Sequence, residues 1–141
     1  MTDEYQIDSI DKPGDPVWEA IGGGIHHFNT QQVGESGEKR LCIVLYAPDW
    51  EIVGGVIGET YWGWFYLSLM WVKEELRGKG HGSRLLERAE EEARQRGVKY
   101  VYLDTFSFQA PEFYSKHGYQ VFGELQDFPP GHQRYFLSKQ L

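Results

Sequence analysis

The chain has 141 residues, of which 40% are hydrophobic and 25% charged, and its formal net charge is −7 at pH 7. This length suits one domain that buries its own core, so we expect a single domain over residues 1–141. The acids concentrate in residues 1–60, where eleven face three bases. That excess argues against a nucleic-acid partner, whose phosphates require a basic surface. It is compatible with a cationic small molecule, or with a surface that only maintains solubility.

The sequence lacks the segments that direct a chain into or across a membrane. No apolar run reaches the roughly 18 residues that span a bilayer, and the first ~20 residues have neither a basic start nor an apolar stretch. Cys42 is the single cysteine, which excludes an internal disulfide and a cysteine cluster for zinc. We therefore expect a soluble cytoplasmic protein with no membrane partner and no metal.

Strands dominate the first half of the predicted order. A short strand is expected over residues 5–10, followed by a helix over residues 16–30 that Gly22-Gly23-Gly24 weakens. Apolar and β-branched side chains then predict three strands in succession, over residues 40–47, 51–58 and 61–72.

The strongest helical pattern runs from Gly82 to Arg96. Apolar residues recur on one face, and Glu90 and Arg94 are spaced to pair on another. The apolar positions are Leu85, Leu86, Ala89 and Ala93. The remaining predicted elements are a strand over 99–105, a helix over 110–117 and strands over 119–125 and 133–138.

A glycine-rich segment, Arg77-Gly78-Lys79-Gly80-His81-Gly82-Ser83, stands immediately before and within the start of that helix. Alternate glycines let backbone N–H groups approach an anion, and the first N–H groups of a helix have no internal partner. Arg77 and Lys79 add positive charge. The segment therefore predicts a diphosphate site.

Other readings of this segment fit less well. A nucleotide-binding Walker loop ends in Lys-Ser or Lys-Thr, and the dinucleotide fingerprint follows the first strand of a parallel unit. Neither feature is present here. A ligand-free connector would explain flexibility, but not three glycines together with two cations at a helix start.

Two segments resemble the GCN5-related N-acetyltransferase (GNAT) family. Its Arg/Gln-x-x-Gly-x-Gly/Ala pattern matches Arg77, Gly80 and Gly82, and its Ala-x-x-Phe-Tyr-x-x-x-Gly-Phe/Tyr helix matches residues 110–119. The resemblance implies an α/β fold of the α+β type, a single GNAT-like domain with a mixed, mostly antiparallel sheet of about six to seven strands and three to four flanking helices. The sheet is expected to be splayed between the strands over 61–72 and 99–105.

The resemblance also implies acetyl-CoA as co-substrate. Its diphosphate would lie on residues 77–83, and its pantetheine arm would pair with the backbone of Trp71 and Val72 like an added strand. The implied binding residues are Trp71, Val72, Arg77, Gly78, Lys79, Gly80, His81, Gly82, Ser83 and Tyr114.

Acetyl transfer to an amine requires a neutral amine, a stabilised oxyanion and assistance to the leaving thiolate. A lysine-like amine has a pKa near ~10.4, so a base or a water chain must take its proton. The resemblance implies an oxyanion donor from backbone N–H near Trp71, and Tyr114 as hydrogen-bond donor to the sulfur; core packing is the alternative for Tyr114. Asp104 is the candidate base, and capping the turn through Thr105 or Ser107 is its equally open structural role.

An acceptor pocket is expected around the first helix, the strands over 51–58 and 61–72, and the loop before the last strand. The run Tyr61-Trp62-Gly63-Trp64 suggests an aromatic surface for a cation or a planar group, with a place in the core or in a dimer seam as the alternative. The candidate acceptor residues are His26, His27, Asn29, Tyr61, Trp62, Asp127 and His132.

The predicted function is transfer of an acetyl group from acetyl-CoA to a primary amine by direct attack in a ternary complex. The acceptor is a small molecule, a peptide or a protein, and the resemblance allows a homodimer. Two alternatives stay open: a non-catalytic acyl-CoA-binding regulatory module, and nucleotide-dependent phosphoryl transfer.

Overall fold

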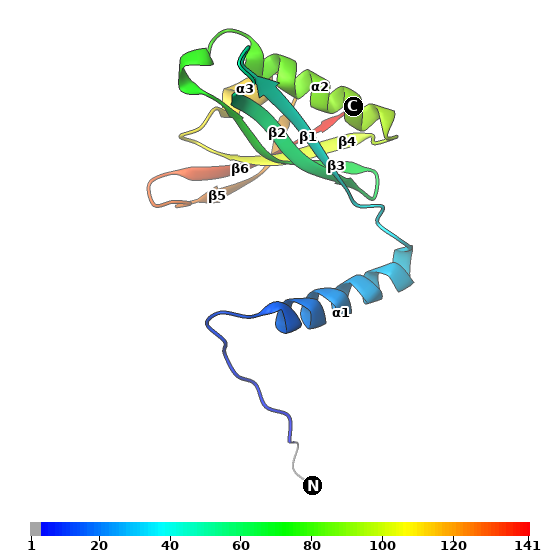
Figure 1. The fold of residues 1–141 in the computed structure, drawn as a ribbon. Coiled ribbons are helices and arrows are strands. Elements are labelled where there is room, and N and C mark those ends of the chain that lie inside the picture. Colours follow the sequence, from blue (N-terminus) through cyan, green and yellow to red (C-terminus); the bar gives the residue numbers. More distant parts are fainter. Residues whose placement is uncertain (1–3) are drawn as a thin grey trace. The chain divides into compact units, whose positions relative to one another are not determined.

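The computed structural model describes residues 4–141 and divides the chain into two compact units, Met1–Ser36 and Gly37–Leu141 (Figure 1). That all 141 residues form one domain stays a prediction. Within the described residues, no helix is long and apolar enough to cross a membrane.

The described part of the first unit contains one helix, α1, Asp15–Val33. It is longer than the predicted helix over 16–30 and includes all three consecutive glycines. Proline near its first position suits a helix start, where an N–H partner is not needed. Apolar side chains recur along α1 at helical spacing and are more than half exposed, namely Trp18, Ile21, Ile25 and Phe28.

The predicted strand over residues 5–10 is wrong, because that segment has no strand backbone. A strand requires a neighbour to satisfy its N–H and C=O groups. The described sheet contains no strand from this segment. Ile7 is 99% exposed, so alternation of apolar residues here does not reflect a buried face.

The second unit contains a six-stranded sheet in the order β1-β2-β3-β4-β6-β5. Figure 1 labels its strands. Only β3 and β4 pair in parallel; the other neighbours are antiparallel. The predicted mixed, mostly antiparallel α/β fold is confirmed. The strands are β1 Lys39–Tyr46, β2 Ile52–Tyr61, β3 Trp64–Val72, β4 Tyr100–Phe106, β5 Gln120–Gln126 and β6 Gln133–Gln140. The helical segments are η1 Glu74–Leu76, α2 His81–Gln95 and α3 Pro111–Lys116.

The strand predicted over residues 61–72 begins too early. Trp62 and Gly63 form the two-residue turn between β2 and β3, with φ values of 46° and 80°. Two successive positive φ angles match the twist of a tight hairpin. Tyr61 therefore ends β2 and faces Trp64 across the hairpin.

One face of the sheet packs on α2. The predicted apolar stripe of α2 is buried in full and contacts side chains such as Phe65, Leu103 and Leu137. Full burial of a leucine such as Leu86 contributes about 1.5–3 kcal/mol. Two layers thus enclose the core and place the start of α2 beside the end of β3.

A closed polar cluster interrupts this core. Glu90 of α2 is 4% exposed. Its carboxylate accepts from the Tyr119 hydroxyl at 2.7 Å and from Lys139 Nζ at 3.0 Å. Burial, followed by the negative charge of Glu90, raises the pKa of Tyr119. We call Glu90, Lys139 and Tyr119 the closed triad.

A bulge in β3 opens the sheet. The register between β2 and β3 pairs Ile57 with Leu69 but Gly58 with Leu67, which leaves Ser68 as an extra residue. A bulge bends its strand, and pairing of β3 with β4 ends after Tyr66 and Tyr102. The two strands then diverge, so the predicted splay is confirmed.

Gly58 makes this bulge sterically accessible. A Cβ at this position would collide with the carbonyl oxygen of Tyr66 and lie 2.5 Å from Cε1 of Phe65. Only glycine lets β2 approach β3 so closely at this point.

Candidate active site

A pocket of about 480 Å³ occupies the gap between β3 and β4. The unpaired edge of β3 forms one wall, from Leu67 to Val72, and the end of β4 forms the other. The pocket brings together residues predicted to bind the cofactor and residues predicted to take part in the reaction. They are Trp71, Val72, Arg77, Asp104 and Tyr114. The backbone groups of β3 on this side lack a β4 partner and can pair with an extended ligand.

Tyr114 and Asp104 enter the pocket from opposite faces of the sheet. Tyr114 belongs to α3 and packs against the core that α2 covers. Asp104 alternates along β4 with buried Leu103 and Thr105, so it lies on the other face. The gap therefore connects the two faces at the point where both side chains are found.

Burial keeps the Tyr114 hydroxyl protonated. Burial first, and then the negative charge of Asp104, raises the pKa of Tyr114 to about 12. The hydroxyl therefore keeps its hydrogen and can donate a hydrogen bond in the pocket at any physiological pH.

Asp104 is held by two neighbours on its own face. Arg134 of β6 donates from Nε at 2.8 Å and places Nη2 2.6 Å from the same Oδ2 atom. The Tyr66 hydroxyl donates to Oδ1 at 3.2 Å. Burial, followed by the charge of Asp104, raises the pKa of Tyr66. We call Asp104, Arg134 and Tyr66 the open triad, because Asp104 lines the pocket.

The glycine segment forms the predicted turn into α2. Gly78 and Gly80 have φ values of 75° and 84°, a region that a side chain strains. Gly80 caps α2 without a side-chain hydrogen bond, and the first intrahelical bond runs from Arg84 N–H to the Gly80 carbonyl. The N–H groups of His81, Gly82 and Ser83 thus lie at the open, positive end of the helix.

The side chains of this segment point to different partners. Arg77 lines the pocket and donates from Nε to the carbonyl of Val72 at 2.8 Å. The hydroxyl of Ser83 lies 2.9 Å from His117 Nε2, which ties α2 to α3.

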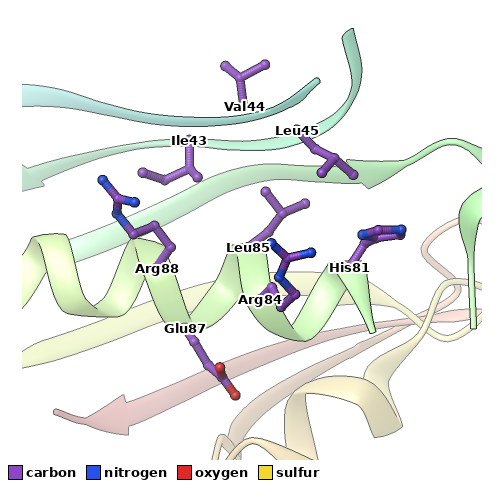
Figure 2. Close-up of a pocket in the computed structure, with 8 residues that line it drawn as sticks. All are labelled: Ile43, Val44, Leu45, His81, Arg84, Leu85, Glu87 and Arg88. Atoms are coloured by element: carbon purple, nitrogen blue, oxygen red, sulfur yellow. The ribbon is translucent and has the colours of Figure 1, made fainter. Parts of the chain in front are cut away.

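His81 lies toward a different cavity (Figure 2). That cavity, about 480 Å³ in volume, lies between β1 and α2, with Ile43 and Leu45 on one side and Arg84 and Arg88 on the other. His81 Nδ1 is buried and has no hydrogen-bond partner within the described residues. Its imidazole therefore does not line the gap where Tyr114 and Asp104 meet.

Among the predicted acceptor residues of the second unit, Tyr61, Trp62 and Asp127 do not line the pocket, whereas His132 packs edge-on against the lining residue Phe108. Tyr61 and Trp62 lie at the hairpin turn; Tyr61 faces Trp64, seven residues or roughly 23 Å along β3 from Trp71. The Tyr61 hydroxyl hydrogen-bonds that of Tyr102 instead. Asp127 lies in the turn between β5 and β6, where Oδ1 accepts from Gly131 N–H at 3.5 Å.

The remaining acceptor candidates from the first helix belong to the other unit. His26, His27 and Asn29 lie on α1, with His26 Nε2 3.9 Å from Glu35. Their part in acceptor binding stays a prediction. No group of three His, Cys, Asp or Glu side chains within residues 4–141 is arranged to hold a metal ion.

Sequence reasoning missed Arg134, Tyr66 and Gln109. A single arginine in an aromatic strand, Gln133-Arg134-Tyr135-Phe136, was the available signal for Arg134. Gln109 stands in the stretch Ser107-Phe108-Gln109, and its Oε1 accepts from Thr105 Oγ1 and Phe106 N–H. The turn after β4 is thus capped by Gln109, while Asp104 remains available to the pocket.

Comparison with known proteins agrees with this geometry. The model of the acetyltransferase (GNAT) family matches residues 5–119. An acetyltransferase of Agrobacterium fabrum is 36% identical over 120 residues, which cover 85% of this chain and 88% of the relative. Blasticidin-S acetyltransferase of Streptomyces morookaense is 41% identical over 92 residues, which cover 64% of this chain and 68% of the relative.

A solved structure has the same fold over nearly the full length. The crystal structure of an acetyltransferase from Bacillus cereus has a TM-score of 0.87 and 34% identity, and the match covers 95% of this chain and 98% of that one. The chain therefore belongs to the acetyltransferase (GNAT) family and is an acetyl-CoA-dependent N-acetyltransferase.

Proposed function

We propose that the pocket between β3 and β4 transfers the acetyl group of acetyl-CoA directly to a primary amine in a ternary complex. The observation that carries the proposal is the presence of Tyr114 and Asp104 in one pocket, from opposite faces of the sheet. This arrangement lets a thioester approach from one face and an amine from the other. The name of the relative that acts on blasticidin S supports a small-molecule amine as acceptor.

The groups proposed to bind acetyl-CoA follow the gap in order. Positive charge from Lys79 and the open N–H groups at the start of α2 receive the diphosphate. The unpaired edge of β3 at Trp71 and Val72 receives the amides of the pantetheine arm. Backbone N–H near Trp71 is the proposed donor to the carbonyl oxygen as negative charge develops there.

In the chemical step, the amine lone pair forms a bond to the thioester carbonyl carbon. The bond from that carbon to sulfur breaks, and its electron pair leaves on the thiolate. The amine must lose one proton before or during attack, because a protonated amine has no lone pair. Asp104, fixed by Arg134 and Tyr66, is the proposed acceptor of this proton.

Tyr114 is proposed to stabilise the leaving thiolate as a hydrogen-bond donor. With a pKa of about 12 for Tyr114 and about 8.5 for a thiol, complete proton transfer to sulfur is unfavourable by roughly 5 kcal/mol. A donated hydrogen bond carries no such cost, and hydrogen bonds to charged groups contribute about 1.5–3 kcal/mol.

The replacement Tyr114→Phe tests this role. We expect kcat to fall by about 10- to 100-fold, the value of one hydrogen bond to a charged group, while acetyl-CoA affinity stays within about twofold. CoA release with a panel of primary amines measures kcat, and calorimetry measures binding. Tyr100→Phe is the matched control, because Tyr100 stacks on Trp64 at the other end of the sheet.

Unchanged kcat in Tyr114→Phe would remove the leaving-group role. Tight acetyl-CoA binding without CoA release for any amine would instead favour the non-catalytic binding module.

A further inference from the structure

Aromatic side chains gather at the rim of the pocket. Phe108 lines the pocket and is 56% exposed. It stacks on Phe106 with centroids 5.3 Å apart and planes 12° apart, and His132 meets its ring edge-on at 5.1 Å. Phe128 packs on Phe106 at 5.5 Å. We call Phe106, Phe108, Phe128 and His132 the aromatic wall.

Hydrogen bonds hold the loop that carries Phe108. The Gln109 side chain accepts from Thr105 Oγ1 at 3.0 Å and from Phe106 N–H at 2.9 Å. Ser107 N–H donates to the Gln133 carbonyl at 2.8 Å, and Gln133 N–H donates to Ser107 Oγ at 3.0 Å. The wall is thus fixed before any ligand arrives, which lowers the entropic cost of binding.

The guanidinium group of Arg134 packs against two rings of the aromatic wall. Its guanidinium carbon lies 5.5 Å from the Phe106 centroid and 5.0 Å from that of Phe128. The same guanidinium holds Asp104. One arginine therefore couples the position of the aromatic rings to the position of the carboxylate proposed to receive the amine.

The exposed ring of Phe108 offers a flat surface on which a planar ring of a ligand can stack. The exposed part of Phe108 is apolar surface beside a pocket that contains a carboxylate, and Asp104 attracts a cationic amine. A ligand that satisfies both features has an ammonium group and a planar ring within one short chain of each other. An aliphatic ring of similar size engages the carboxylate and makes apolar contact with Phe108, but it cannot stack on the Phe108 ring.

We propose that the acceptors of this enzyme are primary amines joined by a short chain to a planar ring, with the ring on Phe108 and the amine toward Asp104. This inference rests on the proposed function and adds the class of acceptor. Phe108 is the specificity-determining residue, because it is the member of the wall that lines the pocket.

Matched amines test the proposal. The pairs are benzylamine with cyclohexylmethylamine and phenethylamine with cyclohexylethylamine, which differ in ring planarity more than in size or charge. We expect the intact enzyme to favour the aromatic member in kcat/KM by about threefold to tenfold, the range measured for aromatic pairs. Phe108→Leu removes this preference, Phe108→Tyr retains it, and Phe122→Ala, an exposed phenylalanine on β5, leaves it unchanged.

Binding is measured separately by titrating each amine into the CoA-saturated protein. Turnover of all amines without aromatic preference, or a preference that survives in Phe108→Leu, overturns this inference and leaves the proposed function standing. Aromatic amines that bind through Phe108 without turnover support the ring site on Phe108 but contradict the proposed function, and with it the role of these amines as acceptors. Equal binding of both members of each pair in the absence of turnover overturns both.

Discussion

The closed and open triads consist of the same three kinds of side chain and lie on opposite faces of β6. Each combines a carboxylate, a cation and a tyrosine, and the cations Arg134 and Lys139 are five residues apart, an odd spacing that points them to opposite faces. In the closed triad, the Glu90 carboxylate is buried between α2 and the sheet. In the open triad, Asp104 lines a pocket. Because Glu90 is buried and Asp104 lines a pocket, we predict that the closed triad serves stability and the open triad serves catalysis.

Removing the cation of the closed triad should have the largest effect. Lys139→Met leaves Glu90 buried with Tyr119 alone, and breaking a buried pair costs about 3–5 kcal/mol. Urea unfolding followed by circular dichroism measures the loss, and Lys99→Met, at an exposed lysine, is the matched control. If the free energy of unfolding fell by less than about 1 kcal/mol, water or other groups would have to stabilise the Glu90 carboxylate in place of Lys139.

Removing the charge of the open triad should affect turnover rather than stability. Asp104→Asn keeps the shape of the side chain but cannot take a proton, so kcat should fall by about a hundredfold. The free energy of unfolding should fall less than in Lys139→Met, because the Arg134–Asp104 pair is more exposed than the Lys139–Glu90 pair. Steady-state CoA release and urea unfolding measure the two quantities. Normal kcat would assign proton removal to water.

The tyrosines should separate the triads by pH. The folded state raises the pKa of Tyr119, so above about pH 10 the unfolded chain releases a proton that the folded chain keeps. The stability that this tyrosine contributes is present below pH 10 and is lost as the pH rises, by up to about 1.4 kcal/mol per pH unit.

Tyr119→Phe should therefore flatten the decline in unfolding free energy between pH 10 and pH 11, as measured by urea titration at each pH. Tyr66→Phe, in the open triad, should flatten it less, since Tyr66 is less buried than Tyr119. Equal slopes in the two variants would contradict the difference in cover on which the comparison rests.

Local patterns in the sequence predicted the parts of the fold that are built locally. The stripe Leu85, Leu86, Ala89 and Ala93 predicted α2 and its buried face, because helical periodicity needs no knowledge of the rest of the chain. The segment around Tyr114 predicted α3 by its proline and its terminal glycine. The placement of Tyr114 in the pocket followed from the family resemblance.

Features that depend on distant residues were beyond such patterns. Asp104 and Arg134 are thirty residues apart and meet only because β4 pairs with β6. The segment over 5–10 has strand-like alternation, yet a strand also needs a neighbour, which sequence alone does not supply. The Trp62-Gly63 turn did carry a local signal, a glycine in a two-residue link, which the aromatic run obscured.

One extra residue, Ser68, forms the bulge that opens this sheet, so the opening depends on the number of residues in β3 as well as on their side chains. Deleting Ser68 would restore an uninterrupted register between β2 and β3. The residues from Leu69 to Val72 would keep their partners on β2 and their faces, since Leu67 and Leu69 would then follow each other in regular alternation. Met70 and Val72 would still pack against the core and Leu69 and Trp71 would still be exposed, but β3 would lose the bend that the bulge gives it. A single codon thus separates a sheet that admits a ligand from one that pairs to its end.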